Sequence, residues 1–555
     1  MKLPIRILMF AAMLPCSGLF GQGLDPAALL KPPVDSWPTY NGDYSGRRYS
    51  TLTQIDSRNV KNLALQWVYR ANNTVGPTTI QGGEGDSYDT ANLPAASIKA
   101  MPLMVNGILY FTVPDHAWAV DARTGHELWH YAWKCRGGHH NGNRGVAMYN
   151  NWLFFETPDD YLVSLDARTG KERWHIRFAD VKEIYYSSPA PVVVGNHVIV
   201  GVGGDALDLP GFLEAHDPET GAVQWKWWST PRKGQPEMNT WPNEYASSHG
   251  GGMTWAPGTY DPALNLYYVG TGNPNPVHAA QSRPGDNLWT CSIVALNPDT
   301  GKMVWYYQVS PHDTHDWDDV EPPVLFDANF KGKPRKLVAQ AARNGYFFVL
   351  DRTTGEHLVT APLLDTLNWT QGVNGKGQPI PNPAKEPQVD GALVSPSSSG
   401  AINWSPPSFS PDTGLFYVST TTSFSVYYKT DTDDHPEGYG GRDTGLGIPH
   451  ATLTAVNYET GAIAWKHDWP GRGDGAGGLS FTGMLSTAGG LLFTNDPSGN
   501  LVGLNAKTGD IVWHVRTNFS AGNGLTNGPE TYLLDDRQYL LWPAGDCVYA
   551  FALNQ

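Results

Sequence analysis

The sequence predicts an all-β protein, specifically an eight-bladed β-propeller whose N- and C-terminal strands complete one blade together. Three observations support this prediction. A short phrase recurs seven times, strand-forming stretches outside those copies lie near both ends, and 21 Trp and 61 Gly among 555 residues suit a turn-rich all-β chain. Although the chain is long, the repeat favours a single ring over several domains.

The repeated phrase reads Asp or Asn, two variable residues, Thr-Gly, three further residues and usually Trp. Its copies lie in residues 119–129, 165–174, 216–225, 296–305, 350–359, 456–465 and 504–513, and the fifth ends in Val instead of Trp. Each copy predicts a strand, a tight turn with Gly where φ must be positive, and a second strand. The closing Trp can pack between neighbouring units, and four-stranded units of about 40–50 residues stack radially into a propeller.

The longer intervals between copies fit a blade plus an insertion. Two inserted segments stand out by composition: residues 370–399 are rich in Pro, Gly and Ser, and residues 430–449 are rich in Asp and Gly. We expect both to form long surface loops, which in compact domains are usually functional or disordered.

The two ends of the chain supply the strands that the seven copies lack. Residues 63–69 read as the last strand of a further blade, and residues 539–542 and 548–552 read as strands of the same blade. Joining them would close the ring and remove exposed sheet edges. We therefore expect low tolerance for truncation at either end.

The first 22 residues read as a signal peptide, with a basic start, an apolar run over residues 7–14 and then mostly small residues. This run is too short for a membrane span, and no other apolar run approaches one. The expected layout is therefore a signal peptide, residues 1–22, and a single propeller, residues 23–555, that is periplasmic or secreted. The formal net charge of −15 argues against a nucleic-acid partner.

Cysteine usage constrains the redox chemistry. Without the signal peptide the chain keeps Cys135, Cys291 and Cys547, so at least one thiol must be free. No Cys-x-x-Cys-His motif occurs, and we expect no covalent c-type haem on this chain.

An acidic loop is the first segment too specific to be scaffold alone. Residues 311–319 read Pro-His-Asp-Thr-His-Asp-Trp-Asp-Asp, a cluster that suggests a general base, a metal site, or both. The alternative is a solvated acidic turn.

A glycine-containing turn is the second such segment. Residues 270–274, Gly-Thr-Gly-Asn-Pro, follow an expected strand, and Asn273 offers an amide oxygen to a hard cation. As an isolated segment, it would read as a plain turn.

Three further segments carry candidate binding residues. Three Gly precede Met-Thr-Trp255, which suggests a Trp held against a flat group, although a core Trp between blades is the alternative. Arg343 enters an expected buried strand, where it needs an acid or an oxyanion, unless it is exposed at the strand end. Arg144, flanked by Asn and Gly, alone reads as a turn residue.

Taken together, these segments resemble the pyrroloquinoline quinone (PQQ)-dependent alcohol dehydrogenases, the eight-bladed quinoproteins. The resemblance runs from residues 37–43 (Trp-Pro-Thr-Tyr-Asn-Gly-Asp) to the closing strands, with the segments in the same order. It implies that Asp316 is the catalytic base beside a bound metal, and that Arg343 contacts the quinone oxygens. It also implies that Trp255 stacks on the cofactor.

The resemblance further implies that Arg144 and Ser188 bind the cofactor's carboxylates and that Asn273 and Asp316 ligate the metal. An acid two residues after the catalytic Asp marks family members that use a lanthanide instead of calcium, and Asp318 fits that pattern. A trivalent ion of calcium-like size gains more from an additional carboxylate.

The chain departs from the family pattern in three places. Ala206 stands where a metal-binding Glu is expected, so Asp205, or else Asp208, would have to supply the carboxylate. Cys135 has no adjacent Cys, so the ring disulfide of many members cannot form, and we hypothesise that the following pair, His139 and His140, covers that face. Lys99 stands where a Glu touches the cofactor, and a Lys there can still pair with a carboxylate.

The resemblance therefore implies a periplasmic PQQ-dependent dehydrogenase. Its substrate would be an alcohol, with an aldehyde or a sugar alcohol as further candidates. Its metal would be Ca²⁺ or a lanthanide, and its electrons would pass to a soluble c-type cytochrome or a similar carrier. The alternative is a non-catalytic propeller of the outer-membrane assembly type, which shares the Asp-x-x-Thr-Gly-x-x-x-Trp phrase but needs neither the acidic loop nor Arg343. An enzyme with another cofactor, or a degenerate quinoprotein, also stays open.

Overall fold

The computed structural model describes residues 23–86, 97–138, 142–204, 208–469, 482–517 and 527–554. The expected signal peptide, residues 1–22, lies outside these ranges. Within the described ranges, no helix has the length and apolar character needed to cross a membrane.

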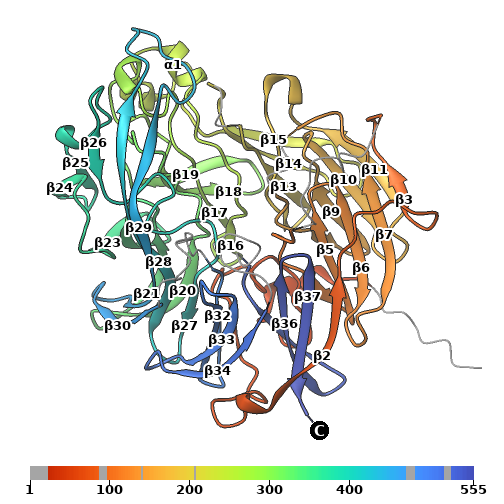
Figure 1. Cartoon of the computed structure of the whole chain (residues 1–555). Helices are drawn as coiled ribbons and strands as arrows, with labels where there is room; N and C mark the ends of the chain where they lie inside the picture. Colours follow the sequence, from red (N-terminus) through yellow and green to blue (C-terminus); the bar gives the residue numbers. More distant parts are fainter. Residues whose placement is uncertain are drawn as a thin grey trace, which may run out of the picture.

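The described chain is built from β-sheets that follow one another around the molecule in sequence order (Figure 1). Eight of these sheets have four or five strands and one is a two-stranded hairpin. The sheets of the N-terminal half are β3 to β7 (Ile80–Gly82, Leu103–Val105, Ile108–Val113, His116–Asp121, Glu127–Trp133), β8 to β11 (Ala147–Tyr149, Trp152–Glu156, Tyr161–Asp166, Glu172–Arg177), β12 to β15 (Val192–Val194, His197–Gly201, Phe212–His216, Val223–Trp228) and β16 to β19 (Thr259–Asp261, Leu266–Gly270, Ser292–Asn297, Lys302–Gln308).

The C-terminal half continues the pattern. Its sheets are β20 to β23 (Val324–Phe330, Lys333–Ala341, Tyr346–Asp351, Glu356–Pro362), β26 to β30 (Ala392–Val394, Ser408–Ser410, Leu415–Lys429, Gly441–Asn457, Ile463–Asp468), β31 to β34 with β1 (Leu485–Thr487, Leu491–Asn495, Asn500–Asn505, Ile511–Arg516, Tyr49–Ser50) and β35 to β37 with β2 (Glu530–Leu534, Arg537–Ala544, Cys547–Leu553, Leu63–Arg70). Helices are short: α1 is Glu244–Ser248, and the 3₁₀ turns are η1 to η6 (Pro26–Leu30, Val60–Asn62, Val181–Glu183, Pro236–Thr240, Ala280–Ser282, Pro383–Lys385).

The repeated phrase forms a turn in which the side chain of the first residue accepts hydrogen bonds from the backbone N–H groups of the residues that follow. In the first copy, Oδ1 of Asp121 accepts hydrogen bonds from the backbone N–H of Arg123 and Thr124, both at 2.9 Å, and Gly125 takes a φ of 72°. A Cβ would disfavour that φ, which is why Gly recurs there. The strand register also shifts by a bulge just before the Asp or Asn in all seven copies.

The closing Trp docks on the turn of the following copy, as the sequence predicts. The indole N–H of Trp129 donates to the carbonyl of Ala167 at 3.0 Å, and a Cβ on Gly170 would lie 2.7 Å from that indole. Trp67, Trp225, Trp305 and Trp465 make the same donation to the next turn. Trp174 packs against Gly221 of the next turn without this bond, because its buried indole N–H has no partner among the described residues. In the copy that ends in Val359, the Gly of the next turn, Gly461, faces Val359 and Ala361.

The two ends of the chain meet in one sheet. Strand β2 pairs antiparallel with β37, with Leu63 opposite Leu553, and β37 pairs with β36 (Figure 1). The strands expected at residues 63–69, 539–542 and 548–552 are therefore neighbours. A buried apolar cluster that includes Trp67, Trp513 and Trp542 packs this sheet against the adjacent ones.

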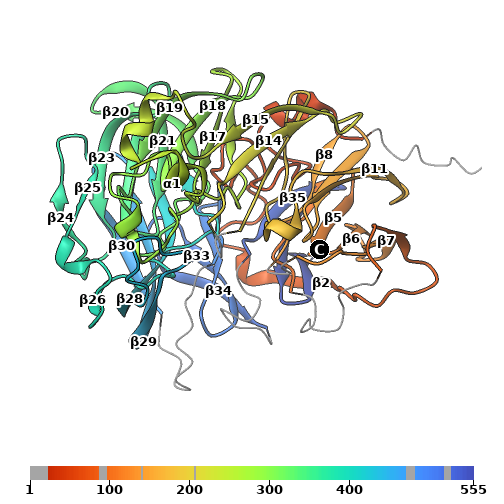
Figure 2. The same ribbon diagram turned by 90° about the horizontal axis from the view of Figure 1, so that it is seen from above.

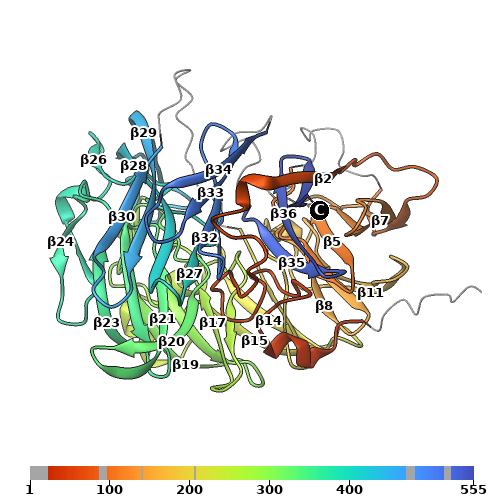
Figure 3. The same ribbon diagram turned by 90° about the horizontal axis from the view of Figure 1, so that it is seen from below.

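The two expected long loops are only partly loops. Residues 370–399 contain β24 (Thr370–Val373), β25 (Pro379–Pro381) and β26, and the β24–β25 hairpin lies at the periphery beside β23 (Figures 2 and 3). Strand β29 begins at Gly441, inside the segment expected as a loop over residues 430–449. This part of β29 is a strand because it pairs with β28: residues Phe424 to Lys429 of β28 lie opposite Leu446 to Gly441. The prediction failed there because Asp and Gly predict turns, whereas cross-strand pairing decides a long hairpin.

Candidate functional site

Asp318 is the centre of the predicted site. It is buried, and its Oδ1 accepts a hydrogen bond from the backbone N–H of Asn273 at 2.8 Å. Its Oδ2 accepts from the indole N–H of Trp255 at 3.1 Å and from Nη1 of Arg343 at 2.5 Å. The structure therefore brings together four residues that lie in four separate segments of the sequence. Arg343 lies in the turn between β21 and β22 rather than within a strand, and it is paired with an acid, as the sequence predicts for a buried Arg.

The glycines of the Gly-Thr-Gly-Asn turn let the backbone approach the acidic loop closely. The turn follows β17, and a Cβ on Gly272 would lie 2.5 Å from Oδ1 of Asp318, while one on Gly270 would collide with the carbonyl of Asp319. Gly272 donates its N–H to the carbonyl of Met253 at 2.8 Å, which ties the turn to the segment that carries Trp255.

Asn273 has the orientation of a metal ligand. Its Nδ2 donates to the carbonyl of Pro274 at 3.2 Å, and its buried Oδ1 has no hydrogen-bond partner among the described residues. A buried amide oxygen without a donor is costly, and a hard cation would satisfy it. Together with the Asp318 carboxylate, which accepts from the N–H of the same Asn273, this oxygen suits an oxygen-preferring ion, although no group of three or more His, Cys, Asp or Glu able to hold a metal occurs among the described residues.

The acidic loop is a packed structure rather than a solvated turn. His315 stacks on Trp317 with ring centres 4.3 Å apart, and the indole N–H of Trp317 donates to the carbonyl of Ser397 at 2.9 Å. The buried carboxylate of Asp313 accepts from the N–H of Trp317 at 3.1 Å. Asp316, which lies between His315 and Trp317 in the sequence, is half-buried and has a φ of 68°. A non-Gly residue in this region is strained, and such strain is concentrated at functional sites.

Arg144, Ser188 and Lys99 form a cationic corner. Nη1 of Arg144 donates to Oγ of Ser188 at 2.8 Å and to its carbonyl at 3.1 Å. Burial lowers the pKa of Arg144 to about 10, and burial together with the charge of Arg144 lowers the pKa of Lys99 to about 8. Two partly desolvated cations, one of which lowers the pKa of the other, favour an anionic ligand beside them.

The cationic corner and the Asp318 cluster belong to one site because Arg144 reaches Trp255. Cζ of Arg144 lies 4.6 Å from the ring centre of Trp255 and 4.6 Å from that of Trp404. Sequence reasoning missed Trp404. Its only signal was an Asn-Trp pair near the Ser-rich insertion, and the structure places it through the bond from the N–H of Ala401 to the carbonyl of Arg343 at 2.8 Å.

Two further acids lie near the site: Asp319, which the sequence placed in the acidic loop without a role of its own, and Glu321, which sequence reasoning missed. Asp319 and Glu321 are buried, and neither carboxylate has a hydrogen-bond partner among the described residues. Burial raises the pKa of Asp319 well above its ordinary value and that of Glu321 to about 8. Opposing this effect, the charge of Arg343 lowers the pKa of Glu321.

The structure does not describe four of the residues singled out in the sequence. Asp205, Ala206, His139 and His140 lie outside the described residues. Asp208 is described, and its Oδ1 accepts from the N–H of Gly438 at 2.9 Å, which directs it toward the loop before β29. Cys291 and Cys547 are buried free thiols, consistent with the expectation of at least one free thiol.

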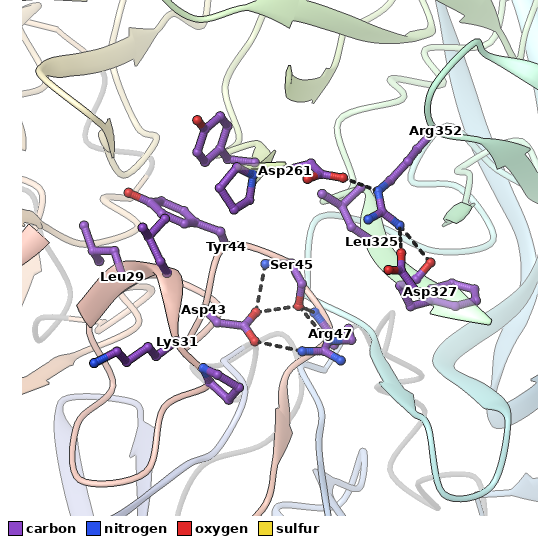
Figure 4. Close-up of a pocket in the computed structure, with 15 residues that line it drawn as sticks. Leu29, Lys31, Asp43, Tyr44, Ser45, Arg47, Asp261, Leu325, Asp327 and Arg352 are labelled. Atoms are coloured by element: carbon purple, nitrogen blue, oxygen red, sulfur yellow. Dashed lines mark hydrogen bonds and ion pairs between the residues drawn. The ribbon is translucent and has the colours of Figure 1, made fainter. Parts of the chain in front are cut away.

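A pocket of about 330 Å³ is lined by none of these residues (Figure 4). Apart from Lys31, its charged side chains pair with one another. Nε of Arg352 lies 2.6 Å from Oδ2 of Asp261, Nη1 of Arg352 lies 2.6 Å from Oδ1 of Asp327, and Arg47 pairs with Asp43 at 3.2 Å. We therefore place the chemistry at Asp318 and not in this pocket.

Comparison with known proteins gives consistent results. Residues 37–362 match the family model described as the β-propeller domain of PQQ glucose/ethanol/alcohol dehydrogenases, and residues 449–551 match the model of the outer membrane protein assembly factor BamB. The quinoprotein alcohol dehydrogenase PedH of Pseudomonas putida is 35% identical, with 89% of this chain and 83% of that protein covered. The lanthanide-dependent methanol dehydrogenase of Methylacidiphilum fumariolicum is 31% identical, with 96% and 88% covered.

Solved structures of dehydrogenases superimpose on this chain over most of its length. The quinohemoprotein alcohol dehydrogenase of Comamonas testosteroni superimposes with a TM-score of 0.81 at 30% identity, covering 96% of this chain and 82% of that one. A europium-containing methanol dehydrogenase superimposes with a TM-score of 0.80 at 28% identity, covering 95% of this chain and 99% of that one.

Proposed function

Because this chain belongs to the family of PQQ-dependent quinoprotein alcohol dehydrogenases, we propose that it oxidises an alcohol with PQQ and a metal ion bound around Asp318. The observation that carries the proposal is the convergence of Trp255, Asn273 and Arg343 on the buried Asp318 carboxylate. These residues come from separate segments, and a scaffold has no need to align them. An aldehyde or a sugar alcohol remains a further candidate substrate.

The residues of the cationic corner would hold the carboxylates of PQQ. Arg144 and Ser188 are already joined, and Lys99 adds a second cation. Trp255 offers a flat, half-buried face. The guanidinium of Arg343, which is paired with Asp318, would also donate hydrogen bonds to the quinone oxygens. When bound, PQQ supplies the acceptor for the hydride that leaves the carbinol carbon.

Asn273, Asp316 and Asp318 would hold the metal, with Asp205 as a fourth ligand. These are hard oxygen donors, as Ca²⁺ and lanthanide ions require. The Asp318 carboxylate favours a trivalent ion, and two of the similar proteins are named for a lanthanide dependence or contain europium. When bound, the ion acts as a Lewis acid.

Asp316 would take the hydroxyl proton of the alcohol. Its half-buried position leaves it accessible to a small substrate, while the stacked His315 and Trp317 hold its backbone. A positioned carboxylate acting as general base contributes about 10²–10⁴ in rate.

The proposal includes the setting of the enzyme. A signal peptide over residues 1–22 would export the propeller of residues 23–555 to the periplasm, and the eight sheets of four or five strands would be its eight blades. A soluble c-type cytochrome or a similar carrier would receive the electrons. The second candidate is a non-catalytic scaffold, which the BamB-model match over residues 449–551 favours. That stretch does not contain Asp318, Asn273, Trp255 or Arg343.

Reconstitution tests the proposal. The chain is prepared without cofactor, mixed with PQQ and either Ca²⁺ or La³⁺, and supplied with short alcohols and an artificial electron acceptor. We expect alcohol-dependent reduction of the acceptor, with more activity in La³⁺. Activity in Ca²⁺ alone would remove the lanthanide assignment, and failure to bind PQQ with either ion would favour the scaffold.

A further inference from the structure

A segment near the N-terminus crosses the part of the molecule where the sheets converge. Residues 37–48, the crossing segment, form hydrogen bonds with strands of six sheets: β4, β12, β16, β20, β27 and β31, through Met104, Val193, Tyr260, Leu325, Phe409 and Ser486. A segment this short reaches six sheets only where they come together, at the centre of the propeller.

Arg48 anchors the end of the crossing segment. Its completely buried guanidinium donates from Nε to the carbonyl of Met484 at 2.7 Å. It also donates from Nη1 to the carbonyl of Tyr40 at 3.0 Å and from Nη2 to that of Pro529 at 2.6 Å. Burial lowers the pKa of Arg48 to about 10, and the charge of Glu530 opposes this effect. Three carbonyl groups therefore hold the guanidinium, and Glu530 remains available for other partners.

Glu530 is a buried acid that the proposed mechanism does not use. It begins β35, directly after Pro529, and neither of its carboxylate oxygens has a hydrogen-bond partner among the described residues. Burial raises the pKa of this carboxyl well above its ordinary value, and the charge of Arg48 opposes the shift. Tyr40 and Tyr532 also interact with it electrostatically. Because a buried carboxyl is costly without hydrogen bonds, Glu530 needs a partner, and water can be one.

Tyr40 links Glu530 to the cationic corner. Its ring packs against Met101, and the N–H of Met101 donates to the carbonyl of Arg144 at 3.0 Å. Burial raises the pKa of the Tyr40 hydroxyl to about 12, and the charge of Glu530 adds to this effect. The charges of Arg144 and Arg48 act in the opposite direction. The Tyr40 hydroxyl and Nε of Arg144 are both buried without a hydrogen-bond partner among the described residues.

A second link runs through Asn527, in the segment before Glu530. Its Nδ2 donates to the carbonyls of Ile98 and Ala100, the latter at 3.2 Å. These two residues flank Lys99 of the cationic corner. Oδ1 of Asn527 is buried and has no hydrogen-bond partner in the described part of the chain. Unpartnered polar atoms therefore occur along both links between the cationic corner and Glu530.

A small cavity lies at the other side of Tyr40. It has a volume of about 30 Å³ and is lined by Tyr40 and Asn41, whose buried Oδ1 also has no partner among the described residues. A cavity of this volume can hold water. Buried polar groups are almost always bonded to protein or to ordered water. The Tyr40 hydroxyl can accept one hydrogen bond and donate another, so it can join water molecules on its two sides.

We propose that buried water joins the cationic corner to Glu530 through the hydroxyl of Tyr40, and that Glu530 relays protons from the cofactor site to the cavity at Tyr40 and Asn41. This inference rests on the proposed function. The oxidation of one alcohol to an aldehyde releases two electrons and two protons. The electrons pass to the carrier, and the protons must reach solvent.

The relay step is balanced without a further reactant. The O–H bond of the protonated Glu530 carboxyl breaks as its proton passes to water in the cavity. A new O–H bond forms on the same carboxylate as a proton arrives from the cofactor site. Glu530 therefore returns to its starting state, and one proton has moved from the cofactor site to the cavity.

Infrared spectroscopy of the cofactor-free protein tests the state of Glu530. The difference between the spectra of the unmodified protein and of Glu530→Gln at pH 7 isolates the carbonyl band of the protonated Glu530 carboxyl. We expect this band to be present and to shift as soon as the protein is transferred into D₂O, because water reaches the carboxyl. A missing band, or a band that does not shift in D₂O, would overturn the proposal.

Turnover of the protein loaded with PQQ and La³⁺ tests the relay itself. We expect Glu530→Gln to lower kcat with an artificial electron acceptor about tenfold or more, with KM unchanged, because the amide cannot pass a proton on. The solvent deuterium isotope effect on kcat should increase, since proton transfer then limits the rate. Glu530→Asp keeps a carboxyl and should restore most of kcat.

Asp160→Asn is the matched control. Asp160 is also a buried acid whose carboxylate has no hydrogen-bond partner among the described residues, but it lies in the turn between β9 and β10 beside Asp159 and Asp180. It should leave kcat and the isotope effect unchanged. If Glu530→Gln behaves like Asp160→Asn, the relay is wrong and the proposed function stands. If the unmodified protein binds no PQQ, both fail.

A crystal structure of the unmodified protein decides the question even where Glu530→Gln does not fold. We expect ordered water bonded to the Glu530 carboxyl and to the Tyr40 hydroxyl. A Glu530 carboxyl bonded only to protein groups, with no water between it and Tyr40, would contradict the relay.

Discussion

Arg343 and Asp318 form a buried ion pair, with Nη1 of Arg343 2.5 Å from Oδ2 of Asp318 and both side chains at most 10% exposed. Removing one partner of a buried pair is strongly destabilising, by about 3–5 kcal/mol, because the other charge is left uncompensated. A metal ion bound by Asp318 would share this carboxylate with Arg343, so metal binding and the position of Arg343 are coupled.

The first prediction concerns the metal. Asp318→Asn should reduce the affinity for La³⁺ about tenfold or more and reduce the affinity for Ca²⁺ less, because a trivalent ion gains more from an anionic ligand. Terbium luminescence sensitised by Trp255 would report binding, since its indole N–H bonds this carboxylate. Asp327→Asn, which also removes a carboxylate from an arginine, is the control. Equal losses for both ions would contradict the assignment of Asp318.

The second prediction concerns the general base. Asp316→Asn should lower kcat for alcohol oxidation by about 10²–10⁴ while PQQ remains bound, because the amide cannot accept the hydroxyl proton at neutral pH. The exposed Asp390, changed to Asn in the same way, should leave kcat unaltered. A fully active Asp316→Asn protein would exclude Asp316 as the base.

The third prediction concerns the turn that carries Asn273. Gly272→Ala would place a Cβ 2.5 Å from Oδ1 of Asp318, so the carboxylate or the turn must shift. We expect weaker metal binding and at least about tenfold less activity, because a displacement near the chemistry of about 1 Å can cost 10² in rate. Gly375→Ala, where a Cβ meets nothing within 4 Å, should behave like the unmodified protein. If both variants keep full metal affinity, the close approach of the turn is not required.

The fourth prediction concerns the pH dependence of cofactor binding. Burial and the charge of Arg144 lower the pKa of Lys99 to about 8, so Lys99 loses its charge as the pH rises through that value. PQQ affinity should therefore fall between about pH 7 and 9, because one cation that faces the carboxylates is neutralised. Lys99→Met should bind PQQ more weakly at pH 7 and without this pH dependence. The same decline in the Met variant would assign it to another group.

The fifth prediction concerns stability. Burial raises the pKa of Asp160 from 3.8 to about 8, so the folded protein binds a proton there that the unfolded chain has released. The folded state therefore loses stability through this group as the pH rises from about 4 to 8. Asp160→Asn keeps the shape, and Asn tolerates the φ of 65°. We expect it to raise the free energy of unfolding by a few kcal/mol at pH 8, with little gain at pH 4. A gain independent of pH would contradict this cause.

Much of the fold was predictable from the repeat, because the turn that each copy forms depends on residues close together in the sequence. Asp121, Thr124 and Gly125 define a turn within a few residues, and the docking of Trp129 on the next turn follows from the regular spacing. The resemblance likewise identified Trp255, Asn273, Asp318 and Arg343, which the structure brings together.

What could not be predicted depends on contacts between distant segments. Trp404 reaches the site through the path of an insertion with no repeat pattern, and the burial of Asp319 and Glu321 depends on distant segments, including Gln340 of β21, which bonds both of their carbonyls. The long β28–β29 hairpin was missed because its Asp- and Gly-rich sequence predicts turns, although cross-strand pairing extends it.

One measurement tests the central claim most directly. The protein loaded with PQQ and La³⁺ is mixed with ethanol without oxygen or any electron acceptor, and the absorbance of the bound cofactor is followed through a single turnover. We expect its conversion to the reduced form with one equivalent of acetaldehyde per site, and no conversion in Asp316→Asn. Bound PQQ that stays oxidised with every alcohol tried would contradict the account.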